Sequence, residues 1–181
     1  MESIRYREAM PGDADAIGRL HVASWRETYA GLLPVQLLDG LSAEARSAMW
    51  QAVLDDPAAF GGTALFVAES KEAIVGFAAA GGQRDGALRA RGYDGEIGAI
   101  YVLASHQCAG VGRALMRLVA KALVDQGRTA ASLWVLRENV PARRFYERLG
   151  GVPAGEKSEE EAGMILTEIA YGWNDLSPLA R

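Results

Sequence analysis

The sequence predicts an α/β domain in which helices flank a mixed, largely antiparallel sheet. Three observations carry this prediction. Two apolar runs, at 64–69 and 73–81, are separated by three polar residues, as in an antiparallel hairpin. A strand-like run at 96–102 is followed by a loop and a strongly amphipathic helix. Strands and helices then alternate to the end of the chain, which is typical of an α/β fold.

Length and composition are those of one domain spanning residues 1–181. The chain has 181 residues, 50% of them hydrophobic and 23% charged, and at this size about 70% of the unfolded surface can be buried. Lys and Arg number 19 against 23 Asp and Glu, a formal charge of -4, which argues against a nucleic-acid partner. The sequence shows no secretory leader and no run of roughly 18 apolar residues. We therefore expect a cytoplasmic protein without a membrane partner.

Cysteine and histidine are scarce, which limits metal and thiol chemistry. The single cysteine, Cys108, excludes an internal disulfide and a zinc site built on paired thiolates. Only His21 and His106 could add imidazole ligands, so we expect no metal. Neither a histidine nor an acid has an evident reason to activate Cys108, so we do not expect it to act as a nucleophile.

The first predicted elements are a short strand and two helices. Residues 3–7 alternate between apolar and polar, which is typical of a strand. Asp13 can cap a helix that stops around Gly31. The inner positions of this helix are Ile17, Leu20 and Trp25. A second helix begins with Ser42 as its N-cap and ends near Pro57. Its predicted buried side consists of Ala45, Met49 and Val53.

The middle of the chain predicts strands around an irregular segment. The hairpin of the two apolar runs closes through residues 70–72. Residues 82–94 are rich in glycine and arginine and lack periodicity, so they predict a mobile loop. The run that follows this loop, 96–102, has strong β character.

The clearest helix follows residue 110 and ends at Gln126-Gly127. Its apolar positions recur at helical spacing: Val111, Ala114, Leu115, Leu118, Val119, Ala122 and Leu123. Such an amphipathic face predicts packing on a sheet.

A strand at 131–136, a shorter helix and a closing strand at 164–171 complete the prediction. The shorter helix ends at Gly150-Gly151. Its apolar side consists of Ala142, Phe145, Tyr146 and Leu149. The glutamate run 159–161 most simply forms a solvated loop. Three late apolar residues could serve either a homodimer interface or the domain's own core: Ile165, Ile169 and Trp173.

The most informative segment is the loop Gln107-Cys108-Ala109-Gly110-Val111-Gly112 between a strand and the long helix. A loop that presents successive N–H groups at a helix start binds anions, because those donors have no partner inside the helix. Gly110 and Gly112 remove side chains that would hold a phosphate away from the backbone. The simpler alternative is that both glycines only permit a tight turn.

Two other phosphate motifs fit this loop poorly. A Walker loop ends in Gly-Lys-Ser/Thr, whereas Gly112 is followed by Arg113-Ala114. A dinucleotide fingerprint needs a third small residue, and position 115 is leucine.

The loop resembles the Gln/Arg-x-x-Gly-x-Gly/Ala signature of the GCN5-related N-acetyltransferases (the GNAT family). The predicted order of elements is similar to that family over nearly the whole chain. Asn139, Ala142, Phe145-Tyr146 and Gly150 resemble the family's Asn-x-x-Ala-x-x-Phe-Tyr-x-x-x-Gly block. Residues 24–34, SWRETYAGLLP, resemble a helix-end motif of one bacterial branch.

The resemblance implies that the chain binds acetyl-CoA. The pantetheine arm would lie along Ile100-Tyr101-Val102, between that strand and a parallel neighbour at 131–136 that splays away from it. A backbone N–H near Ile100 to Val102 would stabilise the oxyanion. The pyrophosphate would be held by the loop residues Gln107, Cys108, Ala109, Gly110, Val111 and Gly112. Arg113 is either a phosphate partner or a solvated helix residue.

The resemblance also implies catalytic roles. Tyr146 lies where the family places the general acid that protonates the departing thiolate, although helical spacing allows a core tyrosine equally well. Glu96 would take the proton from an ammonium substrate, directly or through a water, or is a solvent-exposed strand glutamate. Alternation places Glu96 on the strand face of Gly98, Ile100 and Val102. Asn139 would contact the cofactor, cap the next helix, or both.

The acceptor side is predicted less closely. Trp25 and Tyr29 share one helix face near the place where the family binds its acceptor, although core packing explains them as well. The 82–94 loop would overhang the same mouth. We expect direct transfer to a primary amine of a small molecule, with no acetyl-cysteine. The alternatives are a protein or peptide N-terminus as acceptor, or a CoA-binding sensor without turnover.

Overall fold

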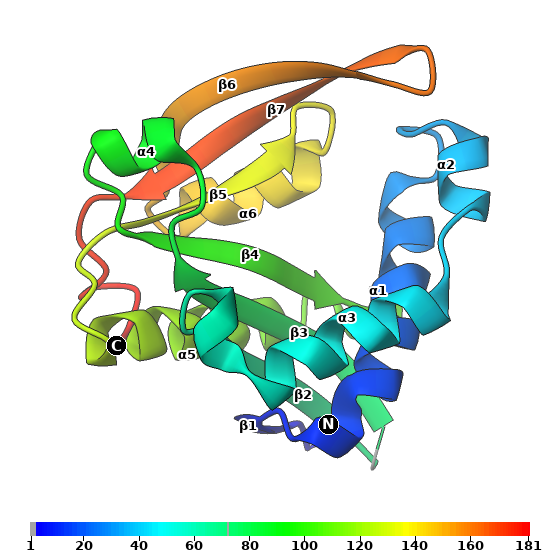
Figure 1. The fold of residues 1–181 in the computed structure, drawn as a ribbon, viewed down its shortest axis with the longest axis horizontal. Helices are drawn as coiled ribbons and strands as arrows, with labels where there is room; N and C mark the ends of the chain where they lie inside the picture. The colour runs from blue at the N-terminus through cyan, green and yellow to red at the C-terminus, as the bar shows by residue number, and fades with distance from the viewer. Residues whose placement is uncertain (1–2, 72) are drawn as a thin grey trace.

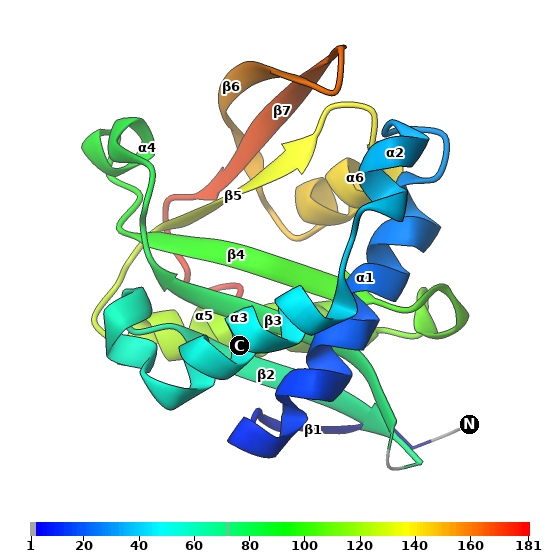
Figure 2. The same ribbon diagram turned by 45° about the vertical axis from the view of Figure 1, so that its right-hand side comes forward.

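The chain forms a seven-stranded sheet with helices on both faces (Figures 1 and 2). The computed structural model describes residues 3–71 and 73–181. Residue 72 of the predicted hairpin loop lies outside this range. The strands are β1 (Arg5–Glu8), β2 (Ala64–Ser70), β3 (Ala73–Gly82), β4 (Gly95–Val102), β5 (Ala131–Leu136), β6 (Val152–Glu161) and β7 (Met164–Trp173). The helices are α1 (Ala14–Tyr29), α2 (Val35–Asp39), α3 (Ala43–Asp55), α4 (Gly86–Ala90), α5 (Val111–Asp125) and α6 (Val140–Arg148).

The strand order is β1-β2-β3-β4-β5-β7-β6. All neighbouring strands are antiparallel except β4 and β5, which are parallel. The expectation of a mixed, largely antiparallel sheet flanked by helices is confirmed. None of the described helices is long and apolar enough to span a bilayer.

The two faces of the sheet have separate cores. On one face, α1 and α3 pack on strands β2 to β4. The core between them includes Ile17 of α1, Trp50 of α3 and Phe77 of β3. On the other face, α5 lies under the centre of the sheet, with Leu115 and Leu123 fully buried. Helix α6 adds to this second core (Figure 2). Each helix therefore buries one apolar stripe, as amphipathic spacing predicts.

A bulge in β4 changes which side chains share a face. The register with β3 moves from Ala80↔Ile97 to Ala79↔Ala99, so Gly98 is the extra residue. Ile97 therefore faces α5, while Ala99 faces α1 and α3. The extra residue reverses which face the side chains of the preceding residues of β4 point to. Glu96, paired with Gly81, therefore lies on the α1 face. The predicted face, that of Ile100 and Val102, is wrong for this reason.

The start of α1 differs from the prediction in its capping. Asp13 precedes the helix, but its carboxylate makes no cap bond to it. It accepts hydrogen bonds from the Arg7 guanidinium (2.6 and 3.0 Å) and from the N–H of Met10 (2.7 Å). The carboxylate binds Arg7 rather than a helix N–H, because a charged guanidinium that donates two hydrogen bonds is a stronger partner than one neutral amide. The salt bridge lowers the pKa of Asp13, against the smaller effect of burial.

Helix α3 begins as predicted, since the Ser42 hydroxyl accepts the Ala45 N–H at 3.1 Å. Its buried side is turned relative to the prediction. Ala45 is exposed, whereas Trp50 and Val53 are buried against the sheet. The large indole of Trp50 gains more by burial than the methyl group of Ala45.

Residues 82–94 are folded, so the predicted mobile loop is wrong. They contain helix α4, which is capped by Asp85 through the N–H groups of Ala87 and Leu88. Leu88 and Tyr93 are buried with Ala154 and other residues of the β5–β7 half. Periodicity could not reveal so short a helix, because its apolar side chains are held by distant strands.

The predicted C-terminal elements lie in place, but the whole strand β6 (Val152–Glu161) was not predicted. Helix α5 ends at Asp125, with Gln126 as its C-cap, followed by Gly127 at φ +80°. Residues 159–161 extend β6 rather than forming a loop, and they pair with the start of β7 at Ile165. Their side chains are exposed. Backbone pairing with β7 satisfies this segment while its charges remain in water.

Candidate active site

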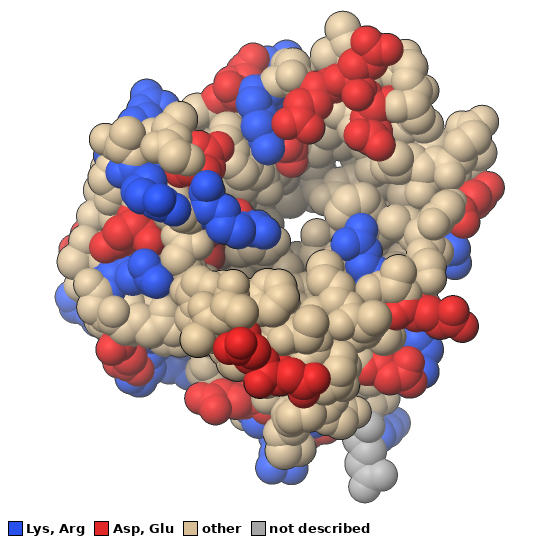
Figure 3. Space-filling view, viewed as in Figure 1, with Lys and Arg blue, Asp and Glu red and all other residues tan. Residues whose placement is uncertain are grey.

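The parallel strands β4 and β5 separate after a short paired start. Their register consists of Gly95↔Ala131 and Glu96↔Ser132. Beyond Glu96 the strands diverge (Figure 1). Figure 3 shows the molecule hollowed between the β2–β4 part and the β5–β7 part, with Lys and Arg side chains at the rim. The expected splay of the parallel pair is confirmed.

The backbone of β4 directs unpaired groups into this opening. The N–H of Leu103 donates to the carbonyl oxygen of Val75 on β3 at 3.0 Å. Because amide direction alternates along a strand, the N–H groups of Ile100 and Val102 point away from β3. The Val102 carbonyl points the same way and accepts the Gln107 side-chain amide at 3.0 Å. An extended ligand could use these groups as β5 would have used them.

The signature loop lies at the open end of the split. Cys108 and Gly110 both have positive φ, 60° and 83°, so the chain turns sharply before α5 begins at Val111. Between described residues, no hydrogen bond of regular geometry has the N–H of any residue from 108 to 113 as its donor. Successive amides without such a partner, ahead of a helix of 15 residues, are an arrangement suited to an anion.

The two glycines of the loop serve different purposes. Gly110 needs its positive φ, and a Cβ there would meet open space. At Gly112 a Cβ would lie 3.2 Å from the Phe145 ring of α6. The absence of a side chain at position 112 therefore lets α5 and α6 pack closely, which sequence reasoning assigned to the phosphate. Cys108 and Arg113 are exposed beside this turn.

Three phenols converge on the opening from α1, β4 and α6. Tyr146 is only 7% exposed, and burial, with a contribution from Tyr101, raises its pKa. Burial likewise raises the pKa of Tyr29, with contributions from Tyr101, Tyr146 and Glu168, while hydrogen bonding to Asn139 acts against them. The Asn139 side chain also caps α6 through the Ala142 N–H at 3.3 Å. The phenols thus stay protonated at neutral pH.

His21 lies beneath Tyr101 and was missed by sequence reasoning. The two rings stack with centroids 4.8 Å apart, and the Trp50 indole N–H donates to Nδ1 of His21 at 3.1 Å. Burial, helped by the positive charge of Arg46, lowers the pKa of His21 to about 4. His21 is therefore neutral at physiological pH. Its position four residues before Trp25 on α1 was the available signal.

Trp25 and Tyr29 lie together at the same opening. Their rings meet edge to face at 5.1 Å, and the Arg46 guanidinium carbon lies 5.7 Å from the Trp25 ring centre. Burial raises the pKa of Tyr101, and the nearby Trp25 indole acts against that rise. The indole N–H is nonetheless buried without a regular hydrogen bond to any described residue. A buried donor without a partner is unusual in a packed core.

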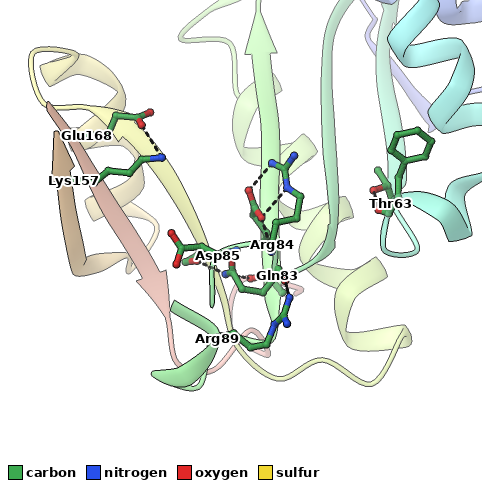
Figure 4. Close-up of polar contacts among 11 residues, drawn as sticks. Thr63, Gln83, Arg84, Asp85, Arg89, Lys157 and Glu168 are labelled. Carbon is green, nitrogen blue, oxygen red and sulfur yellow. Dashed lines mark hydrogen bonds and ion pairs between the residues drawn. The ribbon is translucent and has the colours of Figure 1, made fainter. Parts of the chain in front are cut away.

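Glu96 lies at the closed end of the split and is bound by Arg84. Figure 4 labels Arg84 together with its neighbours Gln83 and Asp85. Its Oε2 accepts the backbone N–H and Nε of Arg84, both at 3.0 Å, and its Oε1 accepts Nη2 at 2.6 Å. The Glu96 side chain is 10% exposed, whereas that of Arg84 is 78% exposed. Hydrogen bonding to Glu96 raises the pKa of Arg84.

The backbone that carries Arg84 is fixed by its neighbours. Gln83 is buried, and its Nε2 donates to the Gly95 carbonyl at 3.0 Å and to the Ser132 hydroxyl at 2.7 Å. The Asp85 N–H donates to Oε1 of Gln83 at 3.1 Å, and the Arg89 guanidinium donates to the Gln83 carbonyl. Gln83 therefore bridges the paired ends of β4 and β5 (Figure 4).

The structure groups the predicted residues at one opening. Three of them come from β4: Ile100, Tyr101 and Val102. Trp25 and Tyr29 come from α1, Tyr146 comes from α6, and Asn139 is the N-cap of α6. Within the described ranges, no group of three or more His, Cys, Asp or Glu side chains is placed to hold a metal ion.

A mixed sheet opened between two parallel strands, with an anion-binding turn at the mouth of the opening, defines the class of CoA-dependent acyltransferases. The model of the acetyltransferase (GNAT) family matches residues 22–151. The chain belongs to this family, as the signature loop predicted.

The chain is also similar to individual proteins. It is 35% identical over 177 residues to the uncharacterised N-acetyltransferase YuaI of Bacillus subtilis, covering 97% of this chain and 96% of that one. The PaiA N-acetyltransferase of Thermoplasma acidophilum, solved in complex with coenzyme A, has the same fold, with a TM-score of 0.70 and 18% identity over 92% of this chain and 98% of that one. YncA of Salmonella typhimurium, solved with acetyl-CoA, has a TM-score of 0.71 and 18% sequence identity, covering 97% of this chain and 95% of that one.

Proposed function

We propose that residues 1–181 form one cytoplasmic acetyltransferase domain that moves the acetyl group of acetyl-CoA to a primary amine of a small molecule, by direct attack in a ternary complex. The observation that carries this proposal is the early separation of β4 and β5. It leaves the Ile100 and Val102 amides free along a channel that ends at the 107–112 turn. Coenzyme A and acetyl-CoA bound to proteins of the same fold support this choice of co-substrate.

The cofactor would bind chiefly to main-chain groups. The free amides of the turn suit the pyrophosphate, with Arg113 exposed beside them. The pantetheine amides would pair with β4 on the side that β5 vacates. The N–H of Ile100 or Val102 would then meet the thioester oxygen and stabilise its negative charge during attack.

The catalytic side chains would move protons at the two ends of the reaction. Glu96, directly or through a water, accepts a proton from the acceptor ammonium, so that the free amine can attack the carbonyl carbon. A C–N bond forms and the C–S bond breaks. Tyr146, kept protonated by burial, donates to the leaving thiolate and regains a proton from the acylated nitrogen. No acyl group passes through Cys108, which lies in the turn.

The acceptor side favours a small molecule. Trp25, Tyr29 and Tyr101 surround the opening with rings, and α4 with Arg84 covers it from the other side. A protein or peptide N-terminus remains the second candidate acceptor, and a CoA sensor without turnover is the third. A sensor has no use for a proton donor at Tyr146 or an acceptor at Glu96.

The test offers acetyl-CoA with a panel of small amines and N-terminal peptides. Free thiol release gives the rate, and a mass gain of one acetyl group identifies the product. We expect turnover on a small amine, and Glu96→Gln should lower kcat/KM about 10- to 100-fold. Glu160→Gln, the same change at an exposed site on β6, should leave the rate unchanged. Thiol release with peptides alone, or none with any acceptor despite CoA binding, would refute the proposal.

A further inference from the structure

We infer that the Arg84 guanidinium occupies the place of the acceptor's cationic group on Glu96, and that a cationic aliphatic amine without a neighbouring carboxylate displaces it. This inference rests on the proposed function and names the acceptor class for the same site. Arg84 is thus a positioning residue that covers Glu96 until the acceptor arrives.

The first support is the position of the pair on the sheet. The bulge at Gly98 turns Glu96 onto the α1 face, which it shares with Tyr101. The guanidinium lies over this bulge, because a Cβ built on Gly98 would be 3.5 Å from Nη2 of Arg84. A cation bound to Glu96 therefore lies beside the point where β4 and β5 part, next to the expected path of the thioester.

The second support is the unequal exposure of the partners. The Arg84 side chain is 78% exposed and the Glu96 side chain 10%. A structural ion pair of the interior would bury both groups, because an exposed cation adds little stability. Here a solvent-facing guanidinium covers a nearly buried carboxylate, as a bound ammonium would.

The third support is that Glu96 keeps a partner after the exchange. Its Oε2 accepts the Arg84 backbone N–H at 3.0 Å, while Oε1 is bound only by the guanidinium at 2.6 Å. Rotation of the Arg84 side chain therefore frees Oε1 and also removes Nε from Oε2, which keeps the backbone N–H as its partner. The backbone stays in place, because Gln83 is bonded to both β4 and β5 and Asp85 caps α4.

The pair also identifies the kind of acceptor. Oε1 accepts hydrogen bonds from N–H donors carrying positive charge, so an ammonium or guanidinium can replace the resident one without an uncompensated charge. An α-amino acid would instead use Arg84 to bind its own carboxylate. The two acceptor classes therefore predict opposite effects of removing Arg84.

The kinetic test compares Arg84→Ala, Arg84→Lys and wild type with 1,4-diaminobutane, propylamine and glycine as acceptors. If Arg84 holds the site most of the time, its removal should lower KM for the two aliphatic amines about fivefold or more. KM for acetyl-CoA should stay unchanged. Arg84→Lys should restore the wild-type KM for the amines, and glycine should not gain. A raised KM for the amines, or a lowered one for glycine, would overturn the inference.

The matched control is Arg19→Ala, which removes another exposed arginine paired with one carboxylate, Asp15. It should leave every KM unchanged. Thermal unfolding of each variant separates a folding defect from an effect on the site.

A second measurement does not depend on turnover. Guanidinium chloride at millimolar concentration is titrated into ¹⁵N-labelled protein, and the amide signal of Gly98 is followed. Arg84→Ala should bind the ion saturably with a shift at Gly98, and wild type should not. Absence of binding to the variant would refute the inference even if the enzyme acetylates amines. Binding without any turnover would uphold the cation site while the proposed function fails.

Discussion

The two halves of the opening differ in the chemical groups that form them, because one uses the main chain and the other uses side chains. The proposed cofactor half consists of the 107–112 turn and the amides of Ile100 and Val102 that point away from β3, all main-chain groups of one continuous segment. The proposed acceptor half consists of side chains from α1, β4 and the segment before α4, namely His21, Trp25, Tyr29, Glu96, Tyr101 and Arg84. The first half is local and the second is assembled by the fold.

This difference explains what each half can tolerate. Main-chain donors need glycine and a particular turn, so the cofactor half depends on backbone conformation. Side-chain groups need only be brought together, so the acceptor half can change its ligand by exchanging residues. Changes in one half should therefore leave binding to the other unaffected.

The largest effect is expected where the halves meet, at Tyr146. Tyr146→Phe should lower kcat about 100-fold or more, because the thiolate loses its proton donor. The affinity for CoA and the amine KM should stay within about twofold, since the lost hydroxyl would act only in the reaction. Steady-state kinetics and calorimetric titration with CoA measure the three quantities.

Tyr6→Phe serves as the control for that change. Tyr6 is a half-buried tyrosine on β1, at the far edge of the sheet. It should keep the full rate. Equal kcat for wild type and Tyr146→Phe would reduce Tyr146 to a core residue.

The next effect is a loss of stability at low pH, caused by a residue of the acceptor half. Burial, with Arg46, lowers the pKa of His21 from 6.5 to about 4, so the unfolded chain binds one more proton between these values. The contribution is complete above pH 6.5 and is lost as the pH falls, by about 3 kcal/mol of unfolding free energy at pH 4. Urea unfolding between pH 7 and 4 measures this slope.

His21→Asn tests the assignment, because its amide oxygen can still accept the Trp50 indole N–H. The variant should unfold with a shallower dependence on pH in this window. An unchanged slope would show that other groups cause the acid sensitivity.

The smallest effect concerns the cofactor half and compares two glycines of α5. Gly110 at its start and Gly127 after its end have φ of 83° and 80°, and a Cβ at either would meet open space. Alanine at each should cost about 1 to 2 kcal/mol of unfolding free energy. Gly110→Ala alone should weaken CoA binding, about 5- to 10-fold, because strain relief shifts the free amides.

Calorimetric titration with CoA decides between the two variants, and both should keep the amine KM. If Gly127→Ala weakened CoA as much as Gly110→Ala, general destabilisation would explain the loss. If neither did, the turn would not hold the diphosphate.

Much of the fold could be predicted because its elements have local signals. The hairpin of β2 and β3 and the long amphipathic helix α5 were found in place by their periodicity. Helix α4 was missed because five residues carry no periodic signal. Strand β6 was missed, including its glutamate end, because pairing with β7 overrides low strand propensity.

The site could be predicted in part. The turn, Asn139 and the Phe145-Tyr146 pair lie in continuous motifs, and the structure brings them to the opening. Glu96 was identified, but the predicted face of the sheet was wrong, because the sequence does not reveal the β-bulge at Gly98. Its partner Arg84 lies 12 residues earlier in the chain, and helix α4 separates the two residues in the sequence.

The sequence alone determined the local elements, the anion-binding turn and the family, because each depends on neighbouring residues in one segment. Only the tertiary structure decided which side chains face one another across the opening. It placed neutral His21 under Tyr101, left the Trp25 indole N–H without a regular hydrogen bond to a described residue, and bound Arg84 to Glu96. These outcomes depend on burial and register between distant strands, and no local pattern encodes them.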